Sequence, residues 1–192
     1  MKTVSNDIAH EIIINKSRFI CILCQVKNEF EINNKLNYYK NKYKDATHYC
    51  TAYIIENHEK CNDDKEPKGT AGIPILNVLK NNELNNILAI VIRYFGGIKL
   101  GAGGLIRAYS KSVRETLKIA DIIKLVNGYL IKINIQYNDI KYFDNLLKKY
   151  KIEKKFTETI TYSFLISEKD LKKINDIIKN NIIFKEPRLI KA

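Results

Sequence analysis

Hydrophobic and polar residues alternate along the first part of the chain in patterns that predict strands and helices in turn. Residues 11–26, EIIINKSRFICILCQV, are typical of two strands joined by a turn around Asn15 to Ser17. Residues 28–43, NEFEINNKLNYYKNKY, have apolar side chains at helical spacing. Residues 47–55, THYCTAYII, combine alternation with the β-branched and aromatic residues favoured in strands. We therefore expect two strands, a helix and a third strand.

The next segments predict a loop, a short helix and a buried strand. Residues 56–72, ENHEKCNDDKEPKGTAG, are polar and interrupted by Pro and Gly, so we expect a long surface loop there. Pro74 suits the first turn of a helix that extends through Leu79. Residues 87–95, ILAIVIRYF, form a continuous apolar run, which is typical of a strand buried on both faces.

A cluster of glycines follows this run and leads into an amphipathic helix. Five of the chain's eight glycines lie between Gly96 and Gly104. The helix is expected over residues 102–121, with an apolar face and a basic face. The apolar face comprises Ile106, Tyr109, Val113, Leu117 and Ala120, and the basic face comprises Arg107, Lys111, Arg114 and Lys118.

Residues 128–192 predict a second domain. Their pattern indicates the order strand, helix, strand, strand, helix, strand, with Ser167 as the N-cap of the second helix. This order is the ferredoxin-like arrangement, a sheet with two helices on one face. Because Asn127-Gly128 is typical of a turn, we place the domain boundary there and expect domains at 1–127 and 128–192. The expected fold class is α+β.

The formal net charge of +12 favours an anionic partner such as RNA. Lys, Asn and Ile are all frequent in this chain, so genome composition also accounts for part of the lysine count. Three of the five arginines, Arg93, Arg107 and Arg114, lie in or near the glycine cluster. Lysine is far more frequent in this chain, so arginine at these positions indicates that the planar, bidentate geometry of its guanidinium is needed there. No apolar segment reaches 18 residues, and the first residues lack the pattern of a secretory signal. We expect a cytoplasmic protein with no membrane partner.

Metal and cofactor sites are weakly indicated. Cys21 and Cys24 form a CxxC within a predicted strand, where residues three apart point to opposite faces, so we do not expect zinc. Asp63, Asp64 and Glu66 offer the oxygen ligands that Mg²⁺ prefers, or they belong to a solvated loop. We expect no cofactor.

The glycine cluster matches neither of two familiar phosphate-binding loops. Gly96 and Gly97 lack the sequel of a P-loop, and Gly101 and Gly103 are followed by Ile106 where a dinucleotide fingerprint needs its third glycine. The remaining alternatives are a helix N-terminus that attracts an anion, and tight packing of a strand against a helix.

The motifs in this order resemble the IMPACT/YigZ family. The resemblance rests on GIPIL at 72–76, ILAIVIRYFGGIKLG at 87–101 and LGAGGLIRAY at 100–109, with DATHYCTAY and SRFI upstream, and it covers essentially the whole chain. It implies a first domain with the fold of elongation factor EF-G domain IV and a ferredoxin-like second domain similar to EF-G domain V. Eukaryotic members of the family regulate translation, and bacterial members have no established reaction.

The resemblance also implies which residues matter, although Lys65 and Lys68 stand where the family prefers small residues. The matching motif positions and the basic helix together give two sets. The expected anion- or nucleic-acid-binding set is Arg93, Gly96, Gly97, Lys99, Gly101, Gly104, Arg107, Lys111 and Arg114, and the candidate pocket is Asp45, His48, Asp63, Asp64, Glu66 and Thr70.

Three functions remain open from the sequence. The first is a non-catalytic RNA- or ribosome-binding factor involved in translation regulation. The second is an enzyme for a small phosphorylated or nucleotide substrate, with His48 as acid or base and with Arg93 and Arg107 as a phosphate clamp. The third is a protein-binding regulator. The second function requires His48, the arginines and the acidic loop, which contains Asp63, Asp64 and Glu66, to converge. The sequence does not indicate an oligomeric state.

Overall fold

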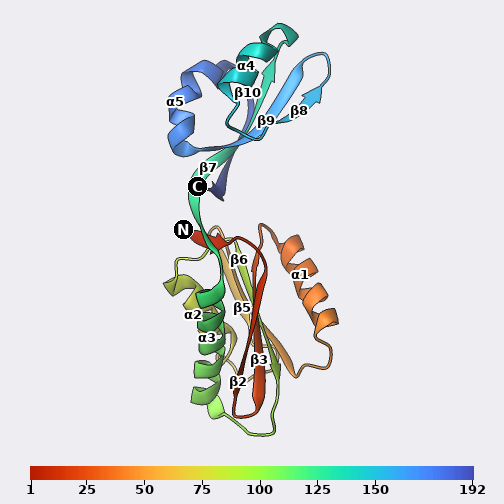
Figure 1. The fold of residues 1–192 in the computed structure, drawn as a ribbon, viewed down its shortest axis with the longest axis vertical. Coiled ribbons are helices and arrows are strands. Elements are labelled where there is room, and N and C mark those ends of the chain that lie inside the picture. The colour runs from red at the N-terminus through yellow and green to blue at the C-terminus, as the bar shows by residue number, and fades with distance from the viewer. The chain divides into compact units, whose positions relative to one another are not determined.

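A computed structural model describes all residues, 1–192, and the chain divides into two compact units (Figure 1). The first unit is Met1–Ile123 and the second is Lys124–Ala192. No helix is both long enough and apolar enough to cross a lipid bilayer.

The first unit is built on a five-stranded antiparallel sheet. The central strand β6 (Ile87–Tyr94) is buried along its whole length except at Tyr94, as the continuous apolar run predicts. A short strand, β1 (Lys2–Val4), lies outside this sheet. The order across the sheet is β2 (Ile8–Ile14), β3 (Ser17–Gln25), β6, β4 (His48–Ile55) and β5 (His58–Asn62).

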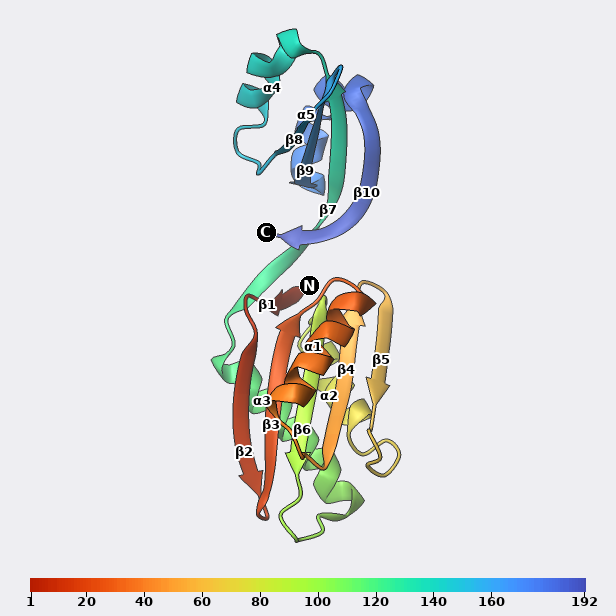
Figure 2. The same ribbon diagram turned by 90° about the vertical axis from the view of Figure 1, so that its right-hand side faces the viewer.

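Helices cover both faces of this sheet. Helix α1 (Glu29–Lys42) lies over one face, and α2 (Gly72–Asn81) and α3 (Gly101–Ile119) lie over the other (Figure 2). Cys21 packs in the core beneath α2 and α3, whereas Cys24 packs in the core beneath α1. The two thiols therefore point to opposite faces of β3, as expected from strand geometry.

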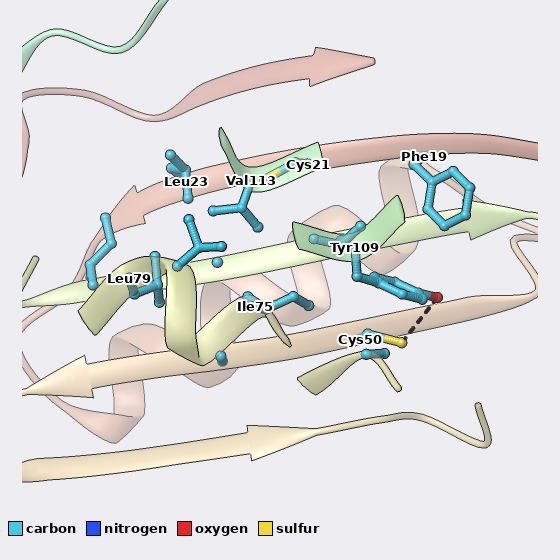
Figure 3. Close-up of a cluster of buried hydrophobic side chains, with 14 of the residues drawn as sticks. Phe19, Cys21, Leu23, Cys50, Ile75, Leu79, Tyr109 and Val113 are labelled. Atoms are coloured by element: carbon cyan, nitrogen blue, oxygen red, sulfur yellow. Dashed lines mark hydrogen bonds between the residues drawn. The ribbon is translucent and has the colours of Figure 1, made fainter. Parts of the chain in front are cut away.

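Figure 3 shows the larger of the first unit's two cores, where Tyr109 and Val113 of α3 pack beside Ile75 and Leu79 of α2. The ring of Phe19 meets that of Tyr109 edge to face, with centroids 5.3 Å apart. These contacts fix α3 against the sheet.

Two expectations for the first unit are wrong. The polar segment after β4 is not a loop throughout, because its first part folds back as edge strand β5 and pairs with β4. Ile106 of the predicted apolar face is 42% exposed. The rest of that face is confirmed, because Tyr109 and Val113 are buried and Leu117 and Ala120 pack against the core, but the buried face also includes Leu105, Ala108, Ser112 and Thr116. The buried stripe thus includes small and polar residues, which an apolar pattern passes over.

The second unit has the order strand, helix, strand, strand, helix, strand, with a single-turn 3-10 helix before the first α-helix (Tyr137–Asp139) and after the second (Lys179–Asn181). Ser167 caps its second helix by accepting a hydrogen bond from the Asp170 N–H, as predicted. The elements are β7 (Ile122–Ile135, of which residues from Lys124 onward belong to this unit), α4 (Ile140–Leu146), β8 (Glu153–Phe156), β9 (Ile160–Ser167), α5 (Glu168–Ile178) and β10 (Ile182–Lys191). The antiparallel sheet order of these strands is β10, β7, β9, β8.

The turn predicted at Asn127-Gly128 is wrong, because both residues lie within the continuous strand β7. Gly128 pairs with Ser167 of β9 and Arg188 of β10. A Cβ at this position would lie only 2.5 Å from the carbonyl oxygen of Ile166. The glycine therefore allows close packing between strands and does not reverse the chain.

Candidate functional site: the loop end of the first unit

Four connecting segments meet where β3 and β4 begin and β6 ends. The Thr47 N–H donates to the Arg93 carbonyl oxygen at 2.8 Å, and the Phe95 N–H donates to Thr47 Oγ1 at 3.0 Å. Gly96 packs directly against the backbone of Lys16. We call this region the loop end, and define it as residues 15–17, 43–48, 63–71 and 93–100.

Arg93 and Glu66 form a buried ion pair inside the loop end. Arg93 Nη1 lies 2.6 Å from Glu66 Oε1, and the exposed fractions of the two side chains are 6% and 3%. The Tyr109 hydroxyl donates to the same carboxylate oxygen at 2.7 Å. Arg93 Nη2 also lies 3.4 Å from Ser17 Oγ, while Arg93 Nε has no partner. The structure thus turns Arg93 inward, away from the exposed anion-binding face on which we expected it.

His48 adjoins this ion pair. Its Nδ1 lies 2.7 Å from the Asp64 carbonyl oxygen, so Nδ1 carries the donated proton in the neutral ring. Its Nε2 lies 3.7 Å from Glu66 Oε1, and the side chain is 15% exposed. His48, Glu66 and Arg93 therefore converge, as the hypothesis of an enzyme requires. Arg107 does not join them, because it is exposed on α3.

Cys50 completes the buried polar cluster as a donor. Its thiol lies 3.0 Å from the Asp63 carbonyl oxygen and 3.3 Å from the Tyr109 hydroxyl (Figure 3). Burial raises the pKa of the Cys50 thiol to about 12 and also raises that of the Tyr109 hydroxyl. Both groups therefore keep their protons near neutral pH and serve as hydrogen-bond donors.

The acidic residues do not converge on a metal. The Asp63 carboxylate accepts hydrogen bonds from the N–H groups of Gly69, Ala71 and Gly72, and the Asp64 carboxylate accepts from the Tyr49 N–H. Glu66 is taken by Arg93, and no three metal-binding side chains gather anywhere in the chain. The carboxylates instead fold the loop.

The two other members of the predicted pocket shape the backbone. Thr70 Oγ1 donates to the Pro67 carbonyl oxygen at 2.6 Å. Asp45 is exposed and has a left-handed backbone with φ 61° between α1 and β4. Neither residue forms a hydrogen bond with His48, Glu66 or Arg93. Of the six residues predicted to line a pocket, His48 and Glu66 are therefore in contact with Arg93, and the others form contacts that shape the loops.

The glycines of the cluster have separate backbone roles. A Cβ on Gly96 would overlap the carbonyl carbon and oxygen of Lys16, whereas Gly97 and Gly101 have left-handed φ values of 83° and 68°. Gly104 lies against the Leu100 side chain. Helix α3 then begins with no side-chain cap and no acidic residue in its first turn. Tight packing therefore accounts for Gly96, and the free N–H groups of α3 remain available.

Exposed cations gather at the loop end and along α3. Lys118 of α3 pairs with Glu115 at 2.8 Å, whereas eight others form no ion pair. Sequence reasoning missed half of them, because only folding brings their loops together. We call this set the basic surface; it comprises Lys16, Lys44, Lys65, Lys68, Lys99, Arg107, Lys111 and Arg114.

The fold and this site define an α+β protein of two units, in which four loops pack together at one end of the first unit and expose unpaired cations. Residues 15–117, which contain the whole loop end, match the family described as the Impact N-terminal domain. The chain belongs to the IMPACT family.

Three comparisons illustrate the range of likeness. The chain is 41% identical over 174 residues to the IMPACT family member YvyE of Bacillus subtilis, covering 88% of this chain and 80% of that one. It is 36% identical over 110 residues to YigZ of Escherichia coli, covering 55% and 54%. A crystal structure of a hypothetical protein matches all of this chain and 96% of its own, with a TM-score of 0.69 at 24% identity, which shows the fold alone.

Proposed function

We propose that this IMPACT-family protein is a non-catalytic RNA- or ribosome-binding factor that acts in translation in the cytoplasm. The observation that carries the proposal is the basic surface, eight exposed cations of which none is paired with a carboxylate. The family's implied likeness to EF-G domain IV, and to domain V in a ferredoxin-like second unit, agrees with such a role.

The physical argument is release of counterions. An exposed cation without a carboxylate partner is free to contact a phosphate, and each contact releases ions condensed on the nucleic acid. Arg107, Lys111 and Arg114 recur at four and three residues on the solvent side of α3, so their Cα atoms span about 10 Å along one line. That line supplies several contacts to one phosphate backbone.

Binding of RNA and ribosomes across a salt series tests the proposal. The triple variant Arg107→Gln, Lys111→Gln, Arg114→Gln should lower the slope of log affinity against log salt by about 2 to 3. The matched control is Lys149→Gln, Lys172→Gln, Lys173→Gln, which removes the same charge from three cations that are already paired in the second unit. Equal slopes for the two triple variants would remove α3 from the interface, and binding that ignores salt, or no binding, would refute the proposal.

One observation favours a second candidate, an enzyme or receptor for a small phosphorylated compound. His48 Nε2 is partly exposed beside the buried Glu66 and Arg93, an arrangement suited to proton transfer. Thermal unfolding in the presence of nucleotides or inorganic phosphate tests this candidate. Stabilisation of the parent protein that disappears in His48→Gln would support it, and stabilisation by none of these compounds would argue against it.

A further inference from the structure

Phe95 is an exposed aromatic side chain at the loop end. It is 46% exposed and follows β6 directly, before the Gly96-Gly97 pair. Its open position does not come from a flexible loop, because its backbone N–H is bonded to Thr47 Oγ1 at 3.0 Å. The next N–H, from Gly96, is bonded to Ser17 Oγ at 3.2 Å. The backbone that carries the exposed ring is thus fixed by two hydrogen bonds.

The ring is also supported from within. The guanidinium carbon of Arg93 lies 5.4 Å from the centroid of the Phe95 ring and 5.4 Å from that of Phe19, so Arg93 contacts both aromatic rings. Arg93 is itself fixed by the ion pair with Glu66. A ring held in this way loses little conformational entropy when a ligand stacks on it.

Unpaired cations lie on the segments that adjoin Phe95 and on the loop that Phe95 begins. Lys16 lies in the turn that packs on Gly96, and the Lys44 carbonyl oxygen accepts a hydrogen bond from the hydroxyl of Tyr94 at 3.0 Å. Lys99 follows four residues after Phe95 in the same loop. Lysine is depleted at protein–protein interfaces, whereas an aromatic ring among cations is the composition of surfaces that stack bases and contact phosphates.

We infer that the loop end binds RNA that offers an unpaired base, and that this base stacks on Phe95. The inference rests on the proposed RNA-binding function and adds the form of the ligand, a single strand, loop or bulge. Bases within a continuous A-form duplex are stacked on one another, so their faces are closed to the ring. The cations at Lys16 and Lys99, on the segments next to Phe95, then contact the phosphates on either side.

The chain has no tryptophan, which permits a direct test. Phe95→Trp introduces a single indole at the proposed stacking position, and Phe156→Trp introduces one at a 59% exposed position in the second unit as the matched control. Each variant is titrated with a ten-nucleotide oligouridine, with a blunt RNA duplex and with polyglutamate. We expect the single strand to quench the fluorescence of the Phe95→Trp variant, the duplex to leave it unchanged, and the control variant not to respond.

Affinity measurements complete the test. Phe95→Ala should weaken single-strand binding about 5- to 150-fold without changing the salt slope, and Phe95→Tyr should retain most of the affinity. Salt-dependent RNA binding with no quenching and no effect of Phe95→Ala would overturn the inference while leaving the proposed function standing. Quenching by polyglutamate alone would indicate an acidic protein partner and would overturn it too. Absence of RNA binding in every variant would instead remove the proposed function.

Discussion

The guanidinium of Arg93 and the carboxylate of Glu66 are in contact at 2.6 Å although 27 residues separate them in the chain. Arg93 is the penultimate residue of β6, the central strand of the first unit, and Glu66 lies in the acidic loop. Their ion pair therefore ties the loop to the sheet, and the Arg93 side chain supports the exposed ring of Phe95. A buried structural contact thus determines the shape of the surface above it.

Loss of one partner of this pair should be strongly destabilising. Arg93→Ala leaves the Glu66 carboxylate buried without a counter-charge, so we expect the free energy of unfolding in urea to fall by about 3–5 kcal/mol. The control is Arg18→Ala, since Arg18 pairs with Glu11 at a position where the side chains are 49% and 38% exposed. That change should cost about 1 kcal/mol or less. Similar losses for the two variants would contradict a special role for the buried pair.

Gly96 and Gly103 should respond oppositely to the same substitution. A Cβ on Gly96 overlaps the backbone of Lys16, so Gly96→Ala should lower stability by about 1–3 kcal/mol or more. A Cβ on Gly103 meets only the tip of Arg107 at 3.6 Å, and alanine favours the helix, so Gly103→Ala should raise stability by up to about 1 kcal/mol. Thermal unfolding of both variants measures the difference. A neutral Gly96→Ala would show that the β2–β3 turn yields easily.

Most strands and helices were predicted correctly, because hydrophobic periodicity and capping residues depend only on residues close together in the sequence. The apolar run of β6 and the N-cap Ser167 are examples, and both are confirmed. Local signals fail where a long-range contact decides the outcome. Asn127-Gly128 is typical of a turn, yet Gly128 lies in strand β7. A glycine is needed there because the Ile166 carbonyl oxygen occupies the space that a Cβ would fill.

The same limit applies to the candidate site. Arginine beside glycines indicates an anion-binding surface when only the sequence is seen, and Arg107 is indeed exposed. Arg93 has the same neighbours but turns inward, because Glu66 reaches it from another loop. Lys16 and Lys44 join the loop end for the same reason, since their turns meet β6 only after folding.

The four cysteines should react with alkylating reagents at two distinct rates. Cys21, Cys24 and Cys50 are fully buried, and burial raises the pKa of each thiol, for Cys21 and Cys50 to about 12. Cys61 is partly exposed on edge strand β5, although burial raises its pKa as well. In the native protein we expect iodoacetamide to label Cys61 slowly and the others only on unfolding. Mass spectrometry identifies the labelled sites, and rapid labelling of Cys50 would contradict the closed cluster.

Asp63 should make the acidic loop sensitive to acid. Burial raises the pKa of its carboxyl, but hydrogen bonds from the N–H groups of Gly69, Gly72 and Ala71 outweigh this and hold the pKa below its ordinary value of 3.8. The pKa of Asp63 is lower in the folded than in the unfolded protein. The stability that its carboxylate contributes is therefore fully present above pH 3.8, and it is lost as the pH falls through the pKa of the folded state. Asp63→Asn removes the charged acceptor, and we expect it to lower stability by about 1–2 kcal/mol at neutral pH.

This loss should shrink as the solution is acidified, since the parent carboxylate becomes protonated and weakens as an acceptor. Urea unfolding of the parent and variant between about pH 7 and pH 3 follows the difference through that window. Asp121→Asn is the matched control, because Asp121 is exposed and its side chain makes no hydrogen bond. A difference between parent and Asp63→Asn that stays constant down to the lowest pH would show that the three N–H donors hold the loop without favouring the charged form. If the stability difference from the parent shrinks with falling pH for Asp63→Asn but not for Asp121→Asn, the Asp63 carboxylate is the acid-sensitive link between the loop and α2.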